Sequence, residues 1–212
     1  MHRLALRTLY AVDQARFALF RARWRQQLHV EDPASPNLRL TQLRIEPGGR
    51  VEIGALFATE RKPGNLIWVQ AGGTLQLGRE TWLRTEHGEN RLTVFSGARI
   101  EVGPRALING AMLHAKHEIR IGSDARIAFG ARILDSDLHP LDCETPERTE
   151  PVRIGDRVWI GTDALVLAGV SIGDDVVVAA GAVVTRDLPS RVVAVGAPAR
   201  PLREIASRSG CA

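Results

Sequence analysis

The chain has 212 residues, of which 44% are hydrophobic and 25% charged, and this size fits one or at most two globular domains. Its formal charge of +4 comes almost entirely from arginines spread along the chain, with no aromatic-interleaved basic block, so we expect no nucleic-acid partner. No apolar run reaches the roughly eighteen residues of a membrane span, and Cys143 and Cys211 form no disulfide framework, so we expect a cytoplasmic protein.

The first segment, residues 1–37, is predicted to be a basic amphipathic helix followed by a linker. Apolar residues such as Leu9, Phe17 and Trp24 fall on one side of residues 1–30, and several arginines lie elsewhere beside the single Asp13. Residues 31–37 contain two prolines and read as the linker. The helix has two possible roles, which are to plug the open end of the domain that follows or to lie on an anionic membrane surface.

The second segment, residues 38–200, carries a repeat of six residues. An aliphatic residue recurs at every sixth position, namely Ile154, Ile160, Val166, Ile172, Val178 and Val184. A helix repeats its apolar face every 3.6 residues and a half-buried strand every two, so neither explains the pattern. A period of six predicts a parallel β-helix, in which each face contributes one inward side chain and about eighteen residues complete one turn. A β-sandwich rich in Val-Gly turns is the alternative.

The repeat is less regular before residue 100 and is interrupted once after it. Residues 138–151 contain three prolines and many polar groups, which predicts a loop that projects between two turns. After residue 200 we expect a short C-terminal helix over residues 201–212, with Pro201 in its first turn.

The C-terminal half resembles the hexapeptide-repeat acyltransferases, and most closely the maltose and galactoside O-acetyltransferases and the O-acetyltransferases of surface-polysaccharide synthesis. The matching segments are residues 133–140 (ILDSDLHP), 158–161 (VWIG), 169–174 (GVSIGD), 181–189 (GAVVTRDLP) and 196–200 (GAPAR). The resemblance implies an all-β, left-handed parallel β-helix assembled as a homotrimer, with active sites between neighbouring subunits. It also implies acetyl-CoA as the acetyl donor.

The resemblance makes His139 the catalytic base. Acetyl transfer to an alcohol requires removal of the hydroxyl proton, and a neutral imidazole with an ordinary pKa near 6.5 can accept that proton. In an extended segment Asp135 and Asp137 share a face with His139. One interpretation is that a carboxylate orients the ring or binds substrate hydroxyls, and the alternative is that both are solvated turn residues. We retain Asp137 as the candidate supporting residue.

Two further residues match acceptor-site positions of the family. Asn109 lies thirty residues before His139, where sugar-accepting relatives place an asparagine, although an asparagine can also ladder at a β-helix corner. The repeat places Ile160 inside and Trp159 outside, and relatives use such a tryptophan beside the cofactor and acceptor.

Five residues are candidates for binding coenzyme A. Thr185, Arg186, Arg200 and Arg203 match cofactor-contacting positions of the family, and guanidinium groups pair well with phosphate oxygens. Near Ala179 and Ala180 the side chains are small, and backbone N–H groups on the outer face would let the pantetheine lie close along the coil. We expect no metal.

The expected activity is acetyl transfer to a hydroxyl of a sugar or glycan intermediate in surface-polysaccharide, lipopolysaccharide or capsule synthesis. Acetylation of an amino sugar or of a small non-sugar acceptor is the alternative. Two other classes are a non-catalytic β-helix and a zinc hydratase like the γ-type carbonic anhydrases. The hydratase needs three imidazoles, and His114, His117 and His139 do not show its spacing.

Overall fold

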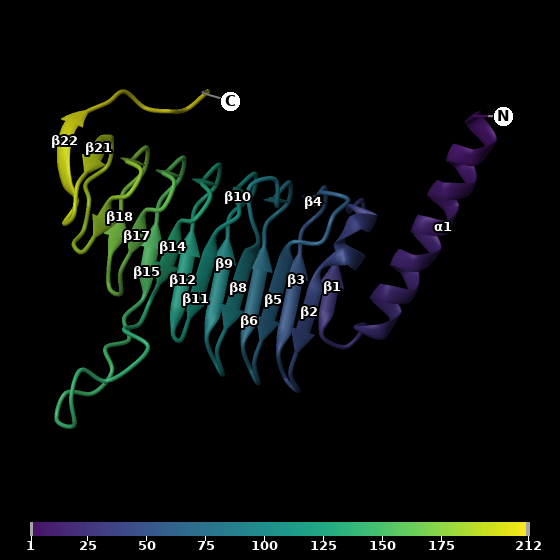
Figure 1. The fold of residues 1–212 in the computed structure, drawn as a ribbon, viewed down its shortest axis with the longest axis horizontal. Coiled ribbons are helices and arrows are strands. Elements are labelled where there is room, and N and C mark those ends of the chain that lie inside the picture. Colours follow the sequence, from purple (N-terminus) through teal and green to yellow (C-terminus); the bar gives the residue numbers. More distant parts are fainter. Residues whose placement is uncertain (1, 211–212) are drawn as a thin grey trace.

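The protein is a left-handed parallel β-helix, as the six-residue repeat and the family resemblance predict (Figure 1). The computed structural model describes residues 2–210, with side chains from residue 11 onward. The chain winds around a narrow core, and each turn contributes a strand to each of three sheets, which we call faces A, B and C.

Face A contains β1 (Leu28–Val30), β3 (Arg50–Ile53), β6 (Thr74–Leu77), β9 (Arg99–Val102), β12 (Glu118–Ile121), β15 (Val152–Ile154) and β18 (Ser171–Ile172). Face B contains β2 (Gln42–Ile45), β5 (Asn65–Val69), β8 (Asn90–Val94), β11 (Met112–Ala115), β14 (Arg132–Leu134), β17 (Leu165–Val166) and β20 (Val183–Val184). Face C contains β4 (Ala58–Thr59), β7 (Trp82–Arg84), β10 (Leu107–Asn109), β13 (Arg126–Ile127), β16 (Trp159–Ile160), β19 (Val177–Val178), β21 (Val192–Val195) and β22 (Arg200–Glu204).

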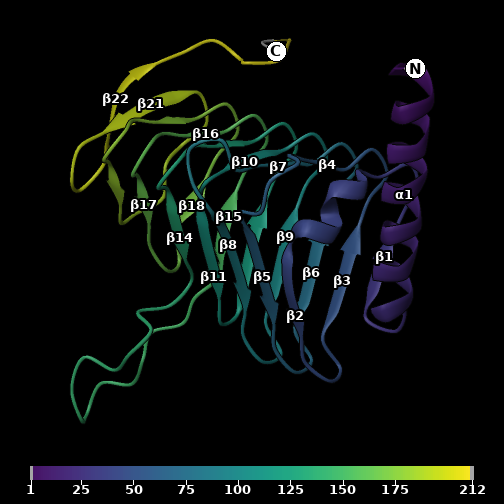
Figure 2. The same cartoon turned by 45° about the vertical axis from the view of Figure 1, so that its right-hand side comes forward.

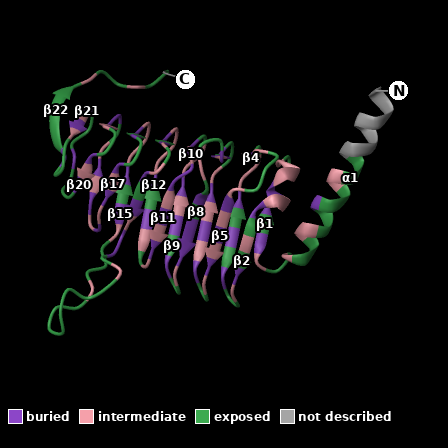
Figure 3. Ribbon diagram, viewed as in Figure 1, coloured by how far each residue is buried: buried purple, intermediate pink, exposed green. Residues whose placement is uncertain are grey.

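The six-residue repeat sets the register of the last turns. Ile154 pairs with Ile172 on face A, and Ile160 pairs with Val178 on face C. The six repeat residues are between 0% and 4% exposed, and the ribbon of the last turns is marked as buried at intervals along each strand (Figure 3). Each repeat residue therefore faces the core in register with its equivalent one turn away. Full burial of such a side chain is worth about 1.5–3 kcal/mol, which makes this stack the main source of stability.

The first turns are longer than the last, and this explains why their repeat is irregular in the sequence (Figure 2). β5 and β8 pair over five residues each, whereas the strands after β15 on faces A and B have two. A buried polar ladder occupies this region. Asn90 donates to Asn65 at 2.8 Å, and Asn65 donates to Thr59 at 2.8 Å. These bonds satisfy amide groups that would otherwise be costly to bury.

The N-terminal helix is confirmed, but the β-helix begins earlier than predicted. α1 spans His2–Arg23, and β1 already pairs with β3 from Leu28, whereas the prediction started the β-helix at residue 38. A short 3-10 helix, η1 (Pro36–Leu40), follows and is capped by the Ser35 side chain. The boundary was missed because Leu28-His29-Val30 alternates over only three residues, too few to recognise as a strand.

The N-terminal end of the core is covered by α1 and η1. Phe17 from α1 and Leu38 from η1 are 4% and 1% exposed and belong to the same apolar core, against which Phe20 and Trp24 also pack. No helix within residues 2–210 is long and apolar enough to cross a membrane.

The predicted C-terminal helix is wrong. Residues 200–204 form β22, which pairs antiparallel with β21 at the edge of face C. The unpaired edge of β21 offers a row of backbone hydrogen-bonding groups, and Pro201 is tolerated there because β22 is itself an edge strand. Residues 205–210 then run back along the β-helix, and residues 211–212 lie outside the described part (Figure 1).

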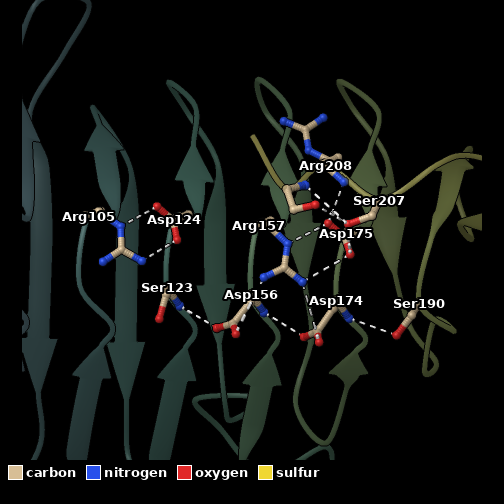
Figure 4. A network of polar contacts seen from close by, with 11 residues as sticks. Arg105, Ser123, Asp124, Asp156, Arg157, Asp174, Asp175, Ser190, Ser207 and Arg208 are labelled. Carbon is tan, nitrogen blue, oxygen red and sulfur yellow. Dashed lines mark hydrogen bonds and ion pairs between the residues drawn. The ribbon is translucent and has the colours of Figure 1, made fainter. Parts of the chain in front are cut away.

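This returning segment, which we call the C-terminal tail (residues 205–210), is attached to the corner at Asp175. The Asp175 carboxylate accepts hydrogen bonds from the Arg208 backbone N–H at 2.7 Å and from the Ser207 hydroxyl at 3.2 Å. The Arg157 Nε donates to the same carboxylate at 2.7 Å (Figure 4).

The predicted projecting loop is confirmed between β14 and β15 (Figure 1). We call residues 136–150 the projecting loop. Its two limbs run antiparallel at the base, where Ser136 is bridged to Thr149 and the Asp137 N–H donates to the Arg148 carbonyl at 3.0 Å. The loop therefore leaves the β-helix from a fixed base.

Candidate active site at the projecting loop

His139 lies where the projecting loop leaves the corner between faces B and A. It follows β14 by five residues and is exposed. Leu138, directly before it, has a left-handed φ of 66°, and its carbonyl accepts a hydrogen bond from Lys116 Nζ at 3.2 Å. An imidazole here is open to substrate, while its backbone is held in place.

Asp135 does not orient the His139 ring, although the alternation of residues 135–139 made that an option. Its carboxylate is fully buried and accepts two hydrogen bonds of 2.7 Å from the backbone N–H groups of Lys116 and His117. The chain bends at this corner, so the alternation of an extended strand does not continue past Leu134. Asp135 is therefore a structural residue.

Asp137 is exposed on the first limb of the projecting loop. Its carboxylate lies close enough to Arg148 to contribute to the raised pKa of that guanidinium, an effect caused mainly by a hydrogen bond to Glu150. Its role in supporting His139 stays a prediction.

Glu147, on the second limb, is bound by Lys116. Lys116 Nζ donates to Glu147 Oε2 at 2.8 Å, and this hydrogen bond is the main reason why the pKa of the Glu147 carboxyl is lowered. The charge of His139 lowers that pKa further.

His114, on β11, has a lowered pKa because it is half-buried, and its ring meets Phe95 edge-on at 6.3 Å.

Sequence reasoning missed Lys116 and Glu147. One signal was present: the 28 basic residues include only two lysines, Lys62 and Lys116, and all the others are arginines. An ammonium group is more compact than a guanidinium, but rarity alone does not separate Lys116 from the exposed Lys62.

Asn109 lies apart from His139 within the chain. It ends β10 on face C, whereas His139 follows a strand of face B. Its Nδ2 is 3.3 Å from His87 Nδ1, and its Oδ1 is buried with no partner among the described residues. It pairs in register with Arg84, so it does not form an asparagine ladder.

Trp159 points outward from face C, as the repeat predicts. It is 45% exposed, while Ile160 is fully buried. The Arg208 guanidinium of the C-terminal tail lies 5.6 Å from the ring centroid. A groove of about 630 Å³ runs between this tail and face C, lined by Trp82, Arg105, Arg126 and Arg157 among others.

The candidate coenzyme A residues lie at the C-terminal end of the β-helix. Thr185 and Arg186 are exposed at the corner after β20, on the same edge as His139 but two turns further along (order β14-β17-β20). Adjacent strands are about 4.8 Å apart, so this separation is about 10 Å along the axis. Arg200 and Arg203 are exposed on β22.

Ala179 lies at the corner after β19 and is half-buried. Its backbone N–H already donates to the Ala194 carbonyl at 2.9 Å, so it does not offer a free donor. What remains of that prediction is the small side chain, which leaves room beside the backbone.

The histidines do not form a metal site. His114 is half-buried and His117 exposed, and residues 2–210 contain no group of three or more His, Cys, Asp or Glu side chains placed to hold a metal ion.

Comparison with known proteins agrees with this arrangement. Residues 151–186 match the family described as the hexapeptide repeat of succinyl-transferase. The chain is 36% identical over 110 residues to the galactoside O-acetyltransferase of Escherichia coli K12, covering 47% of this chain and 54% of the relative. It is 40% identical over 109 residues to nodulation protein L of Rhizobium meliloti, covering 49% and 59%.

The crystal structure of the polySia specific acetyltransferase NeuO has the same fold. The TM-score is 0.54 at 22% identity, over 88% of this chain and 92% of that one. The chain spans about half the length of the curated relatives it matches in sequence.

Proposed function

We propose that this hexapeptide-repeat chain, which is similar to sugar O-acetyltransferases, transfers an acetyl group from acetyl-CoA to a hydroxyl of a sugar or glycan intermediate. The observation that carries the proposal is the exposed His139 at the base of the projecting loop, within a chain 36% identical over 110 residues to a galactoside O-acetyltransferase. We extend it to the glycans of surface-polysaccharide, lipopolysaccharide or capsule synthesis.

His139 acts as the general base. It takes the proton from the acceptor hydroxyl as the hydroxyl oxygen bonds to the acetyl carbon, and it returns that proton to the sulfur when the carbon–sulfur bond breaks. A positioned base of this kind contributes about 10²–10⁴-fold to the rate. The fixed backbone on either side of the loop base supports this role, because a base must be held in line with the hydroxyl that it deprotonates.

The phosphate groups of acetyl-CoA are bound by arginines at the C-terminal end. Arg186, Arg200 and Arg203 are exposed, and none of them is paired with a carboxylate among the described residues. Thr185 adds a hydroxyl donor at the same corner. These groups suit phosphate oxygens, which guanidinium groups bind through paired hydrogen bonds.

The active protein is a homotrimer. Asn109 and Trp159 lie on face C, whereas His139 lies between faces B and A, so one chain does not bring them together. A neighbouring subunit packed side by side would place the face C residues of one copy beside His139 of the next. Asn109, whose buried Oδ1 has no partner among the described residues, would then lie near the acceptor site of the neighbouring copy.

The N-terminal helix binds the inner face of the membrane peripherally and keeps the enzyme at a cytoplasmic surface. α1 exposes the apolar side chains of Val12 and Leu19. Arg16 and Arg23 are also exposed, and their spacing places them on the same face of the helix as Val12 and Leu19. Such a combination of apolar and basic side chains suits anionic lipid headgroups.

The first test is the variant His139→Gln, which keeps a polar side chain but cannot accept the proton. We expect kcat/KM to fall by about 10²–10⁴-fold while the fold is kept. The measurement is thiol release from acetyl-CoA with a panel of free sugars, nucleotide sugars, lipid-linked glycans, amino sugars and serine. The exposed His29 on β1 supplies the control variant His29→Gln, which should retain full activity. Undiminished turnover in His139→Gln would disprove the mechanism. Transfer only to amines would show that the acceptor group is an amine and not a hydroxyl.

A further inference from the structure

Lys116 connects both limbs of the projecting loop to the body of the β-helix. It lies at the corner after β11, nineteen positions from Asp135, whose carboxylate accepts its backbone N–H at 2.7 Å. Its Nζ donates to the Leu138 carbonyl on the first limb at 3.2 Å and to Glu147 Oε2 on the second limb at 2.8 Å. One ammonium group thus joins the corner, the residue before His139 and Glu147 on the second limb.

The contact is partly shielded from solvent. The Lys116 and Glu147 side chains are only 26% and 22% exposed, and the ammonium group lies 5.4 Å from the centroid of the Phe95 ring. Shielding strengthens an ion pair relative to one on an open surface, where it is worth little. The pair is therefore built into the loop base.

The backbone at Leu138 shows what this contact holds. Its φ of 66° lies in the left-handed region, which is unfavourable for a leucine. Two hydrogen bonds maintain it, one from Lys116 Nζ to its carbonyl and one from its N–H to the Ser136 hydroxyl at 3.3 Å. Because Leu138 directly precedes His139, its conformation sets the direction in which the imidazole leaves the chain.

Glu147 completes the arrangement. Its Oε2 is bound by Lys116, its Oε1 is buried, and the Ser136 hydroxyl of the first limb contributes a hydrogen bond that lowers the pKa of this carboxyl. The neighbouring charges at the loop base are Asp137 and Arg148 on the limbs, while the Asp135 carboxylate is occupied by two backbone N–H groups. Glu147 therefore ties the second limb to Lys116 and to the first limb, from which His139 projects.

We propose that Lys116 is a positioning residue for His139, which it holds in place through the Leu138 carbonyl and through Glu147. This rests on the proposed function, because it assigns His139 the role of base. Lys116 itself touches no reacting atom; it fixes the two limbs of the loop base from which His139 projects.

The test compares Lys116→Met, which keeps the aliphatic stem, with Lys116→Arg, which keeps the charge. We expect Lys116→Met to lower kcat by about 10–100-fold with little change in the KM for acetyl-CoA, because misplacing a catalytic group slows the chemical step. Lys116→Arg should recover most of the activity. The other lysine, the exposed Lys62, gives the matched control Lys62→Met, which should behave as wild type.

The second readout is the ring NMR signal of His139, which needs no substrate. Lys116→Met removes the cation that contacts the Leu138 carbonyl and Glu147, so the His139 signal should shift and broaden, and Lys116→Arg should restore it. The ring signals of His29 and His87, which lie on other turns, should stay at their wild-type positions in both variants. A lysine that only stabilised the fold would not displace the His139 signal alone.

The outcomes separate this proposal from the proposed function. A displaced His139 ring signal in Lys116→Met that returns in Lys116→Arg supports the positioning role even if the wild-type protein transfers no acetyl group. If Lys116→Met leaves the His139 ring signal unchanged, or if it keeps the wild-type kcat in an active enzyme, the proposal is overturned.

Discussion

The single residue Asp175 joins three segments of the chain. Its carboxylate is bound by Arg157 from the previous turn and by Ser207 and Arg208 from the C-terminal tail, and it is 4% exposed. These hydrogen bonds, led by that of Arg157, lower the pKa of Asp175 to about 2 despite the opposing effect of burial.

This shift predicts how stability depends on pH. The folded pKa of about 2 lies below the value of about 3.9 for a free aspartate, so the stabilisation is complete above pH 4 and is lost as the pH falls toward 2. Asp175→Asn, which tolerates the same left-handed backbone, should lower the free energy of unfolding by about 2 kcal/mol at pH 7. Urea unfolding at pH 7, 4 and 2.5 measures this, and the difference from wild type should shrink at the lowest pH.

The control is Asp163→Asn, at an exposed corner residue with a φ of 55°. It should change the free energy of unfolding by less than about 0.5 kcal/mol. A pH-independent loss in Asp175→Asn would show that the carboxylate charge is not what stabilises the corner.

Contacts between side chains were the least predictable part of the site. His139 was identified because its local motif is continuous in the sequence. Lys116 and Glu147 are separated by 31 positions, and Asp175 and Arg208 by 33, so only the stacking of turns brings them together. A period of six predicts which residues face inward, but it does not specify which polar side chains meet outside the core.

The corners between faces A and C contain a column of glycines at corresponding positions of successive turns. These are Gly54, Gly78, Gly103, Gly122, Gly155 and Gly173. At Gly103 an added Cβ would lie 2.7 Å from the backbone carbon of Gly122 and 2.7 Å from the Ser123 nitrogen. Here glycine is required because the next turn passes too close for any side chain.

We therefore expect Gly103→Ala to reduce the free energy of unfolding by roughly 1–3 kcal/mol, as for other overpacked sites. Thermal or urea unfolding checks this. Gly97→Asn is the control, because its Cβ would meet nothing within 4 Å and asparagine tolerates the φ of 71°. Equal loss in both variants would argue against crowding as the cause.

The elements were predictable to the extent that they repeat. The period of six predicted the register from Ile154 to Val184, and the proline-rich stretch predicted the projecting loop. The prediction of elements failed at both ends of the β-helix, where β1 is only three residues long and β22 replaces the expected helix. Terminal strands are formed by pairing with an existing edge, and that edge is not visible in the local sequence.

At the scale of the whole molecule, the proposed donor site extends along the β-helix axis. His139 lies after β14, and Arg186 and Arg200 lie on the last turn and on β22. A long, flexible donor whose thioester reaches His139 can place its phosphates near those arginines. We therefore expect the acetyl group to react at the His139 end of the site and the phosphates to bind at the end that contains Arg186 and Arg200.

The double variant Arg186→Ala/Arg200→Ala should raise the KM for acetyl-CoA by roughly tenfold or more, with a small effect on kcat, because it removes charge-assisted hydrogen bonds to phosphate. Initial rates at varied acetyl-CoA measure this. Arg44→Ala, an exposed arginine on β2 at the opposite end, is the control. An unchanged KM in the double variant would exclude both arginines from phosphate binding.

Both ends of the stacked turns are closed. At the first turns, α1 and η1 cover the core. At the last turns, Leu188 bridges Ile172 on face A, the Ala199 N–H donates to Val183 on face B, and the charged, proline-containing β22 finishes face C. Within the described residues, a copy that approached the last turns would meet the charged, proline-containing edge of β22 in place of a flat apolar strand, so polymerisation into a fibre is disfavoured and association is directed to the flanks of the prism.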